Sequence, residues 1–148
     1  MKNEFVTVNF DGQGFCDKKR CLYGIRLRYE KKEYVYIGVT GSSNGKGRNS
    51  PFGRLGTHLK KRGKTLSCLY DKKIADISNI RLMRFVSTYI NDGDNADILE
   101  KWAICNFNIF KNTNGIELLN NKENKCKNID RAEQKIVIAL FERVFETR

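Results

Sequence analysis

The sequence predicts a single α+β domain, built in layers, in which helices flank a small sheet. Two segments rich in Tyr, Ile, Leu and Val, residues 21–29 and 33–40, are separated only by the polar residues 30–32, which is typical of a β-hairpin. The last twenty residues instead carry apolar side chains at helical spacing. A length of 148 residues fits one domain with one core.

The N-terminal segment is predicted to be a peripheral strand. Residues 5–10 alternate loosely between apolar and polar side chains, and residues 11–14 have the composition of a turn. We therefore expect residues 1–20 to form a peripheral extension of the domain.

The register of the hairpin follows from its short turn. A two-residue turn at 30–31 places Tyr23 opposite Gly38, and Tyr36 opposite Ile25, so both tyrosines share one sheet face. Gly38 has no side chain, which leaves space beside the Tyr23 ring for a ligand or a backbone. Tyrosines are common in strands, so the pair alone is also consistent with an ordinary core and rim.

A helix is expected after the glycine- and serine-rich loop 41–49. Ser50 can cap a helix and Pro51 fits its first turn. Apolar residues then recur at helical spacing, namely Phe52, Leu55 and Leu59. Gly63 stands where a C-terminal stop is expected.

Further along the chain, residues 80–89 predict a third strand. The turn 91–94 can cap a helix over about 95–106, whereas the asparagine-rich segment 107–128 has no clear assignment. The terminal helix, within 129–148, carries an apolar face made of Ala132, Ile136, Val137, Leu140, Phe141, Val144 and Phe145. We expect this face to pack on the domain rather than to form a dimer interface.

The charge of the chain points to a polyanionic partner. Lys and Arg outnumber Asp and Glu by 28 to 17, a formal charge of +11, which favours nucleic acid. A basic composition also occurs in proteins that bind no nucleic acid. The start of the chain has no apolar signal region and no segment is long enough to cross a bilayer, so we expect a soluble, cytoplasmic protein.

The cysteines form an odd set without a C-x-x-C pair: Cys16, Cys21, Cys68, Cys105 and Cys126. Such a set favours reduced thiols over a disulfide framework or a zinc site.

Arg54 and His58 are candidate site residues on the first helix. They are four residues apart, so their side chains lie on one helix face. An arginine fork binds phosphate in bidentate geometry, and histidine titrates near neutral pH. His58 is the only histidine in the chain, and taken by itself it is better explained as a chance surface residue.

The order of these elements resembles the GIY-YIG nuclease family. Residues 21–23, Cys-Leu-Tyr, stand where the family has Gly-Ile-Tyr, and 36–38, Tyr-Ile-Gly, match its second motif. Arg54-x-x-x-His58 resembles the helix pair of the family. Each element is common alone, but their joint order is fairly specific.

Two later residues extend the resemblance to about residue 114. Glu100 resembles the metal-binding glutamate of the family, and Asn112, or else Asn114, its late asparagine. The first motif keeps only its tyrosine. The loop between Tyr36 and Arg54 is longer than in repair and homing members, and in this the chain is similar to the restriction-endonuclease branch.

The resemblance implies a small three-stranded antiparallel sheet flanked by helices and a DNA endonuclease that uses Mg²⁺ or Mn²⁺. Its catalytic set would be Tyr23 as general base, Tyr36 and Arg54 on water and phosphate, His58 as proton relay, Glu100 on the metal and Asn112 beneath Glu100. The expected partner is double-stranded DNA, and a homodimer and a monomer fit equally well.

Basic residues flanking this set are expected to hold DNA: Lys46, Arg48, Lys60, Lys61, Arg62 and Lys64. Those near the end of the first helix could instead only stabilise its dipole. Three alternatives stay open: a binding module that does not cut, a basic structural domain with an accidental motif match, and a repair or mobile-element nuclease.

Overall fold

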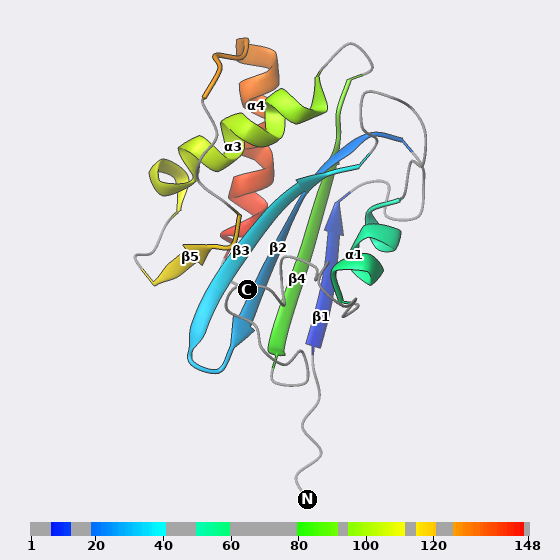
Figure 1. Ribbon diagram of the computed structural model, residues 1–148, viewed down its shortest axis with the longest axis vertical. Coiled ribbons are helices and arrows are strands. Elements are labelled where there is room, and N and C mark those ends of the chain that lie inside the picture. The colour runs from blue at the N-terminus through cyan, green and yellow to red at the C-terminus, as the bar shows by residue number, and fades with distance from the viewer. Residues whose placement is uncertain are drawn as a thin grey trace, which may run out of the picture.

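The fold is a five-stranded sheet with helices on both faces (Figure 1). The computed structural model describes residues 7–12, 19–40, 50–59, 80–91, 95–111, 115–120 and 126–146. Its elements are β1 (Thr7–Gly12), β2 (Cys21–Tyr29), β3 (Lys32–Val39), α1 (Pro51–Leu59), β4 (Ile80–Tyr89), α3 (Ala96–Phe110), β5 (Ile116–Leu118) and α4 (Arg131–Val144). The strand order is β1-β4-β2-β3-β5.

The sheet is mixed, and the expectation of a three-stranded antiparallel sheet is wrong. β2 pairs antiparallel with β3 and β4, but β1 adds parallel to β4 and β5 adds parallel to β3. The N-terminal segment is therefore part of the sheet, where it covers the backbone edge of β4. Alternation along a strand does not reveal its pairing partner, and β5, with three residues, is too short to show a period.

The hairpin has the predicted register. Tyr23 lies opposite Gly38, and Ile25 lies opposite Tyr36. The turn is closed by Glu30, whose φ of 56° lies in the left-handed region. The third strand, β4, also has its predicted bounds.

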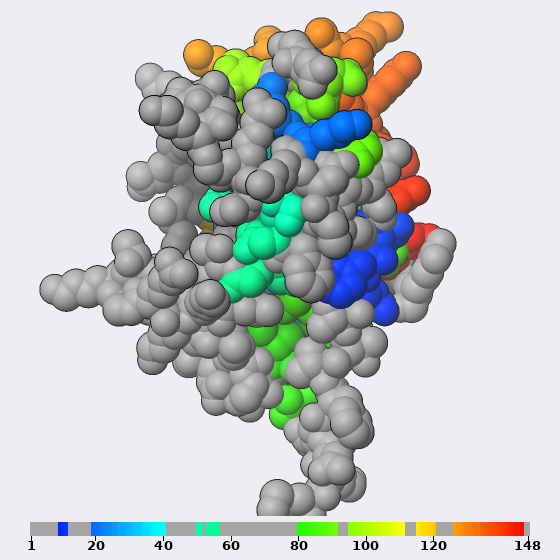
Figure 2. Space-filling view, turned by 90° about the vertical axis from the view of Figure 1, so that its right-hand side faces the viewer, coloured from blue at the N-terminus to red at the C-terminus, as the bar shows by residue number. Residues whose placement is uncertain are grey.

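The two faces of the sheet carry different helices. α3 and α4 cover one face and enclose the larger core, whereas α1 lies on the other face, at the surface beside β1 and β4 (Figures 1 and 2). Gly24 lets α4 approach, because a Cβ there would lie 2.6 Å from Cγ2 of Val144. Most of the predicted apolar face of α4 is buried, so its packing on the domain is confirmed.

Each described helix has a polar cap. The Ser50 hydroxyl accepts a hydrogen bond from the Gly53 N–H at 3.1 Å, as predicted for the start of α1. Asn95 caps α3, which begins where expected but continues to Phe110. Asp130 caps α4 in a capping box. No helix within the described ranges is long and apolar enough to cross a membrane.

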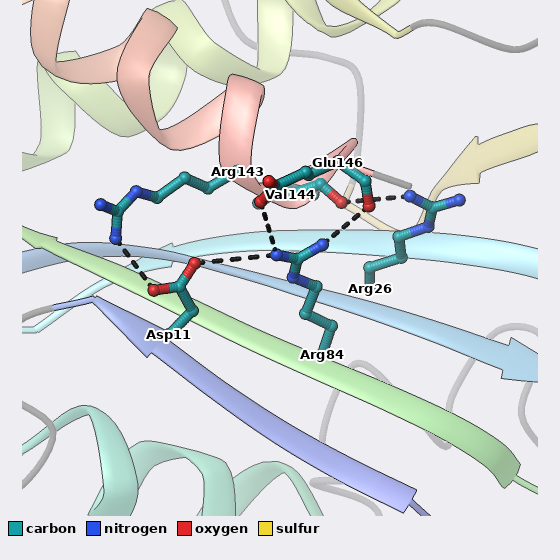
Figure 3. A network of polar contacts seen from close by, with 6 residues as sticks. All are labelled: Asp11, Arg26, Arg84, Arg143, Val144 and Glu146. Atoms are coloured by element: carbon teal, nitrogen blue, oxygen red, sulfur yellow. Dashed lines mark hydrogen bonds and ion pairs between the residues drawn. The ribbon is translucent and has the colours of Figure 1, made fainter. Parts of the chain in front are cut away.

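A set of charged residues, here called the α4 clamp, fixes the C-terminal end of α4 to the sheet: Asp11, Arg26, Arg84, Arg143 and Glu146 (Figure 3). Arg84 donates to the backbone carbonyl of Glu146 at 2.7 Å and to its carboxylate at 2.9 Å. Arg26 donates to the carbonyl of Val144 at 3.3 Å. The clamp thus satisfies the carbonyl of Val144, which the helix end leaves without an intrahelical partner, and holds Glu146 just beyond the helix.

Candidate active site

The two motif tyrosines meet on the α1 face of the sheet. Their ring centroids are 6.2 Å apart, and the Tyr23 ring stacks on Phe85 at 5.3 Å. Tyr23 is fully buried and Tyr36 is partly exposed. A Cβ at Gly38 would collide with Cζ and the hydroxyl of Tyr23. The space that Gly38 leaves is therefore filled by the Tyr23 ring itself, not left for a ligand.

Arg54 reaches this pair from α1. Its side chain is partly buried and shares a hydrogen bond with the Tyr23 side chain. Burial lowers the pKa of Arg54, but the charge interaction and hydrogen bond with Tyr23, and the charges of Tyr36 and Glu100, outweigh burial and raise the pKa above its ordinary value. The Nε atom of Arg54 is buried and has no hydrogen-bond partner among the residues that the structure describes. Arg54 is therefore held as a cation beside two phenols and a carboxyl group.

Glu100 approaches from α3, on the far side of the sheet from α1. Burial raises the pKa of its carboxyl group to about 7, the charge of Asp97 adds to the rise, and Arg54 and Lys101 oppose it. Glu100 and Arg54 thus affect each other electrostatically. Tyr23, Tyr36 and Arg54 thus form one cluster, and Glu100 lies near enough for its charge to raise the pKa of Arg54.

The structure describes the remaining predicted residues only in part. His58 has its backbone in α1, one turn after Arg54, but its side chain lies outside the described part. Asn112 and its alternative Asn114 also lie outside the described residues, as do Lys46, Arg48, Lys60, Lys61, Arg62 and Lys64. Their predicted roles stay predictions.

Asn120 is a residue of the site region that the sequence did not single out. Its Oδ1 accepts from the N–H of Ile37 at 2.8 Å, and its Nδ2 donates to the carbonyl of Ile37 at 2.7 Å. Ile37 stands between Tyr36 and Gly38, so this side chain holds the middle of the motif strand. It continues the pairing in which the N–H of Leu119 donates to the carbonyl of Val35 at 2.8 Å. Residues 107–128 contain several asparagines, and nothing in the sequence distinguishes Asn120 from the others.

Glu100 is the residue of this site that could hold a hydrated hard cation. No group of three or more His, Cys, Asp or Glu side chains able to hold a metal occurs among the described residues. Mg²⁺ takes one or two carboxylates and keeps several waters, which Glu100 can satisfy alone. Because burial disfavours the charged form of Glu100, a divalent cation would supply the missing compensation. Residues and ion therefore fit.

Comparison with known proteins adds no relative. No protein-family model, curated protein or solved structure matches this chain. The groups of the site themselves define what it could do: a guanidinium can bind an anionic oxygen, two phenols can exchange protons, and a carboxyl group can hold a cation.

Proposed function

We propose that the chain is a metal-dependent endonuclease of the GIY-YIG kind that hydrolyses phosphodiester bonds of DNA. The observation that carries this proposal is the hydrogen bond between Arg54 and Tyr23, with Tyr36 and Glu100 close enough to change the pKa of Arg54. An accidental motif match would leave residues from four separate elements scattered. Their convergence supports a shared chemical task.

Arg54 would bind a non-bridging oxygen of the scissile phosphate. Its planar fork donates two parallel hydrogen bonds, and its buried Nε has no partner in the described residues. Negative charge grows on the phosphate as water attacks, so a cation fixed before the reaction stabilises the transition state. Lysine could not reproduce this geometry.

Tyr23 would act as the general base, with Arg54 favouring its phenolate form through their hydrogen bond. Since Tyr23 is fully buried, water must reach its hydroxyl along the side of the more exposed Tyr36. Tyr36 would orient that water or a phosphate oxygen. His58 would accept or relay the proton.

Glu100 would hold the metal, Mg²⁺ or Mn²⁺. When bound, the ion would polarise the phosphate and stabilise the leaving oxygen. The carboxyl group must lose its proton to bind the ion, and with a pKa of about 7 it does so only near and above neutral pH. The active form of the site would therefore be favoured on the alkaline side of pH 7.

Double-stranded DNA is the proposed substrate, in a restriction-type reaction. The formal charge of +11 supports a polyanionic substrate, and Lys46, Arg48, Lys60, Lys61, Arg62 and Lys64 would contact its phosphates. A repair or mobile-element nuclease and a homodimer remain alternatives within this proposal. A non-cleaving module is the alternative outside it, and it has no need of a partly buried carboxyl group beside the phosphate site.

Cleavage of supercoiled plasmid by the purified protein tests the proposal. We expect nicking or linearisation with Mg²⁺, none with EDTA, and none with Glu100→Ala or Tyr23→Phe. Discrete bands would indicate sequence-specific cutting. Salt-sensitive binding without cleavage of DNA or RNA would overturn the enzyme and leave the binding module.

A matched control separates chemistry from packing. Tyr34 lies on β3, two residues before Tyr36 and on the same sheet face, and it is buried. Tyr34→Phe should keep cleavage, whereas Tyr36→Phe should lower it. Equal losses in both variants would mean that the phenols only support the fold.

A further inference from the structure

A second reactive feature lies at the outer side of α3, apart from the candidate active site. Cys105, on α3, and Cys126, before α4, are brought together although far apart in sequence. Their side chains share a hydrogen bond, so the two thiols lie within reach of each other. The neighbouring Asn106 independently places Cys126 there, because its Nδ2 donates to the Cys126 sulfur at 3.7 Å.

The surroundings of this pair fix its geometry. The Asn106 amide also donates to the carbonyl of Trp102 at 2.8 Å, so it is held against the helix. Ile129 is buried and Asp130 caps α4, which anchors the segment that carries Cys126. Cys126 is exposed and Cys105 is partly buried, and neither forms a disulfide here. A small soluble oxidant can therefore reach Cys126.

We propose that Cys105 and Cys126 form a reversible disulfide, a modification site that links α3 to the segment entering α4. The inference does not rest on the proposed nuclease function. It rests on the contact between two thiols held by separate anchored elements. The other cysteine of the described residues, Cys21, is buried in β2.

The oxidant class is a hydroperoxide, and the electrons balance in two steps. The Cys126 thiolate attacks one peroxide oxygen, which gives a sulfenic acid and releases hydroxide. The Cys105 sulfur, after losing its proton, attacks the sulfenic sulfur, the S–S bond forms and a second hydroxide leaves. The two thiol protons convert both hydroxides to water, and two electrons have passed from sulfur to peroxide.

The two cysteines differ in exposure and proton affinity, and this difference assigns them separate roles in the two steps. Burial raises the pKa of the Cys105 thiol to about 11, and the hydrogen bond and charge interaction with Cys126 add to the rise. Cys105 therefore keeps its proton while Cys126 is the exposed sulfur that meets the oxidant. Once Cys126 is uncharged as a sulfenic acid, the charge interaction that contributes to this rise is gone.

The crosslink would close a loop that contains β5 and Asn120. Both contact β3 in the folded protein, so oxidation would hold this edge of the sheet against separation. A loop closure restricts the unfolded chain, and the melting temperature should rise by several degrees.

The test is oxidation of the full chain with one equivalent of hydrogen peroxide, followed by thiol counting and mass spectrometry. We expect five free thiols to become three, a loss of about 2 Da, which corresponds to two hydrogens. A tryptic digest should join peptide 102–111 to the peptide that contains Cys126. Dithiothreitol should restore all five thiols and the original melting temperature.

Variants make the result specific. Cys126→Ser replaces an exposed residue, so the fold should persist, yet the two-thiol loss should vanish, as it should in Cys105→Ser. Cys16→Ser with Cys68→Ser removes two other cysteines and should keep the crosslink, with three thiols falling to one. Crosslinks through another cysteine, covalent dimers alone, or five thiols that persist would overturn the proposal.

Discussion

The two faces of the sheet hold their partly buried arginines in different ways. Arg84, on the α4 face, is matched by carboxylates, with Glu146 at 2.9 Å and Asp11 at 3.7 Å. Arg54, on the α1 face, forms no ion pair with a carboxylate among the described residues and instead shares a hydrogen bond with the phenol of Tyr23. The charge of Arg84 is therefore balanced by carboxylates within the fold, whereas the charge of Arg54 lies beside the weakly acidic phenol of Tyr23.

This difference separates a structural arginine from one that can serve a ligand. The hydrogen bonds of an arginine that pairs with carboxylates are already used to fix the fold, so it has little capacity left for a ligand. Phenols satisfy a guanidinium without cancelling its charge, so the same group can still attract an anionic oxygen. Four predictions test whether the two faces differ in this way.

The largest effect is expected from Arg54→Lys. Lysine keeps the charge but loses the planar fork, so plasmid cleavage should fall about 10²-fold to 10³-fold, as when a transition-state donor is removed. The melting temperature should stay within a few degrees of wild type. Single-turnover cleavage rates and thermal unfolding measure the two quantities.

Arg84→Lys is the matched change on the other face. It should leave the cleavage rate near wild type and lower stability by about 1 to 2 kcal/mol, because Arg84 caps the end of α4. The reverse pattern, with cleavage sensitive to Arg84 and not to Arg54, would contradict the division between the faces.

The second prediction concerns pH. The folded pKa of Glu100, about 7, lies above its ordinary value of 4.5, so the folded protein holds a proton that the unfolded chain releases between these values. Metal-free stability should therefore fall as pH rises from about 4.5 to 7. The loss should be about 2 kcal/mol, discounted because the group is partly exposed.

Glu100→Gln should flatten this part of the stability profile, measured by urea unfolding. Added Mg²⁺ should raise the melting temperature of the wild type at pH 8 and not at pH 5, because protons compete for the carboxylate. A rise of equal size in Glu100→Gln would place the ion elsewhere.

The third prediction is a pair of glycine substitutions. Gly38→Ala would drive a methyl group into the Tyr23 ring, so it should destabilise the fold by about 2 kcal/mol and reduce cleavage. Gly56→Ala meets nothing within 4 Å and lies inside α1, where alanine favours the helix by up to about 1 kcal/mol. Similar stability in both variants would mean that the Tyr23 ring can move away from Gly38.

Local signals in the sequence predicted the centre of this molecule well. Ser50 and Pro51 marked the start of α1, and the short turn at 30–31 fixed which residues face each other across the hairpin. These features are determined within a few residues, by capping and by turn geometry. A grouping of Tyr23, Arg54 and Glu100 could be predicted only through family resemblance, because no local rule places α1 and α3.

The edges of the sheet were not predictable in the same way. β1 and β5 pair in parallel with strands far away in the sequence, and such contacts leave no pattern in the segments themselves. Asn120 was missed for the same reason, since its partner, the backbone of Ile37, has no side-chain signature. Its importance depends entirely on where β5 docks.

The smallest effect is expected from a change at Asn120. This change tests whether the edge of β3 affects the α1 face of the sheet, where Tyr36 lies. Asn120→Ala removes two hydrogen bonds to Ile37, so stability should fall by about 1 to 2 kcal/mol. Because Ile37 adjoins Tyr36, the cleavage rate at saturating DNA should fall severalfold while DNA affinity stays the same. Asn106→Ala is the control, since the Asn106 amide donates its hydrogen bonds to Trp102 and Cys126 instead of to the backbone of Ile37. If both variants cut at the wild-type rate after equal losses of stability, Asn120 supports the sheet alone, and the position of Tyr36 is set by its pairing with β2.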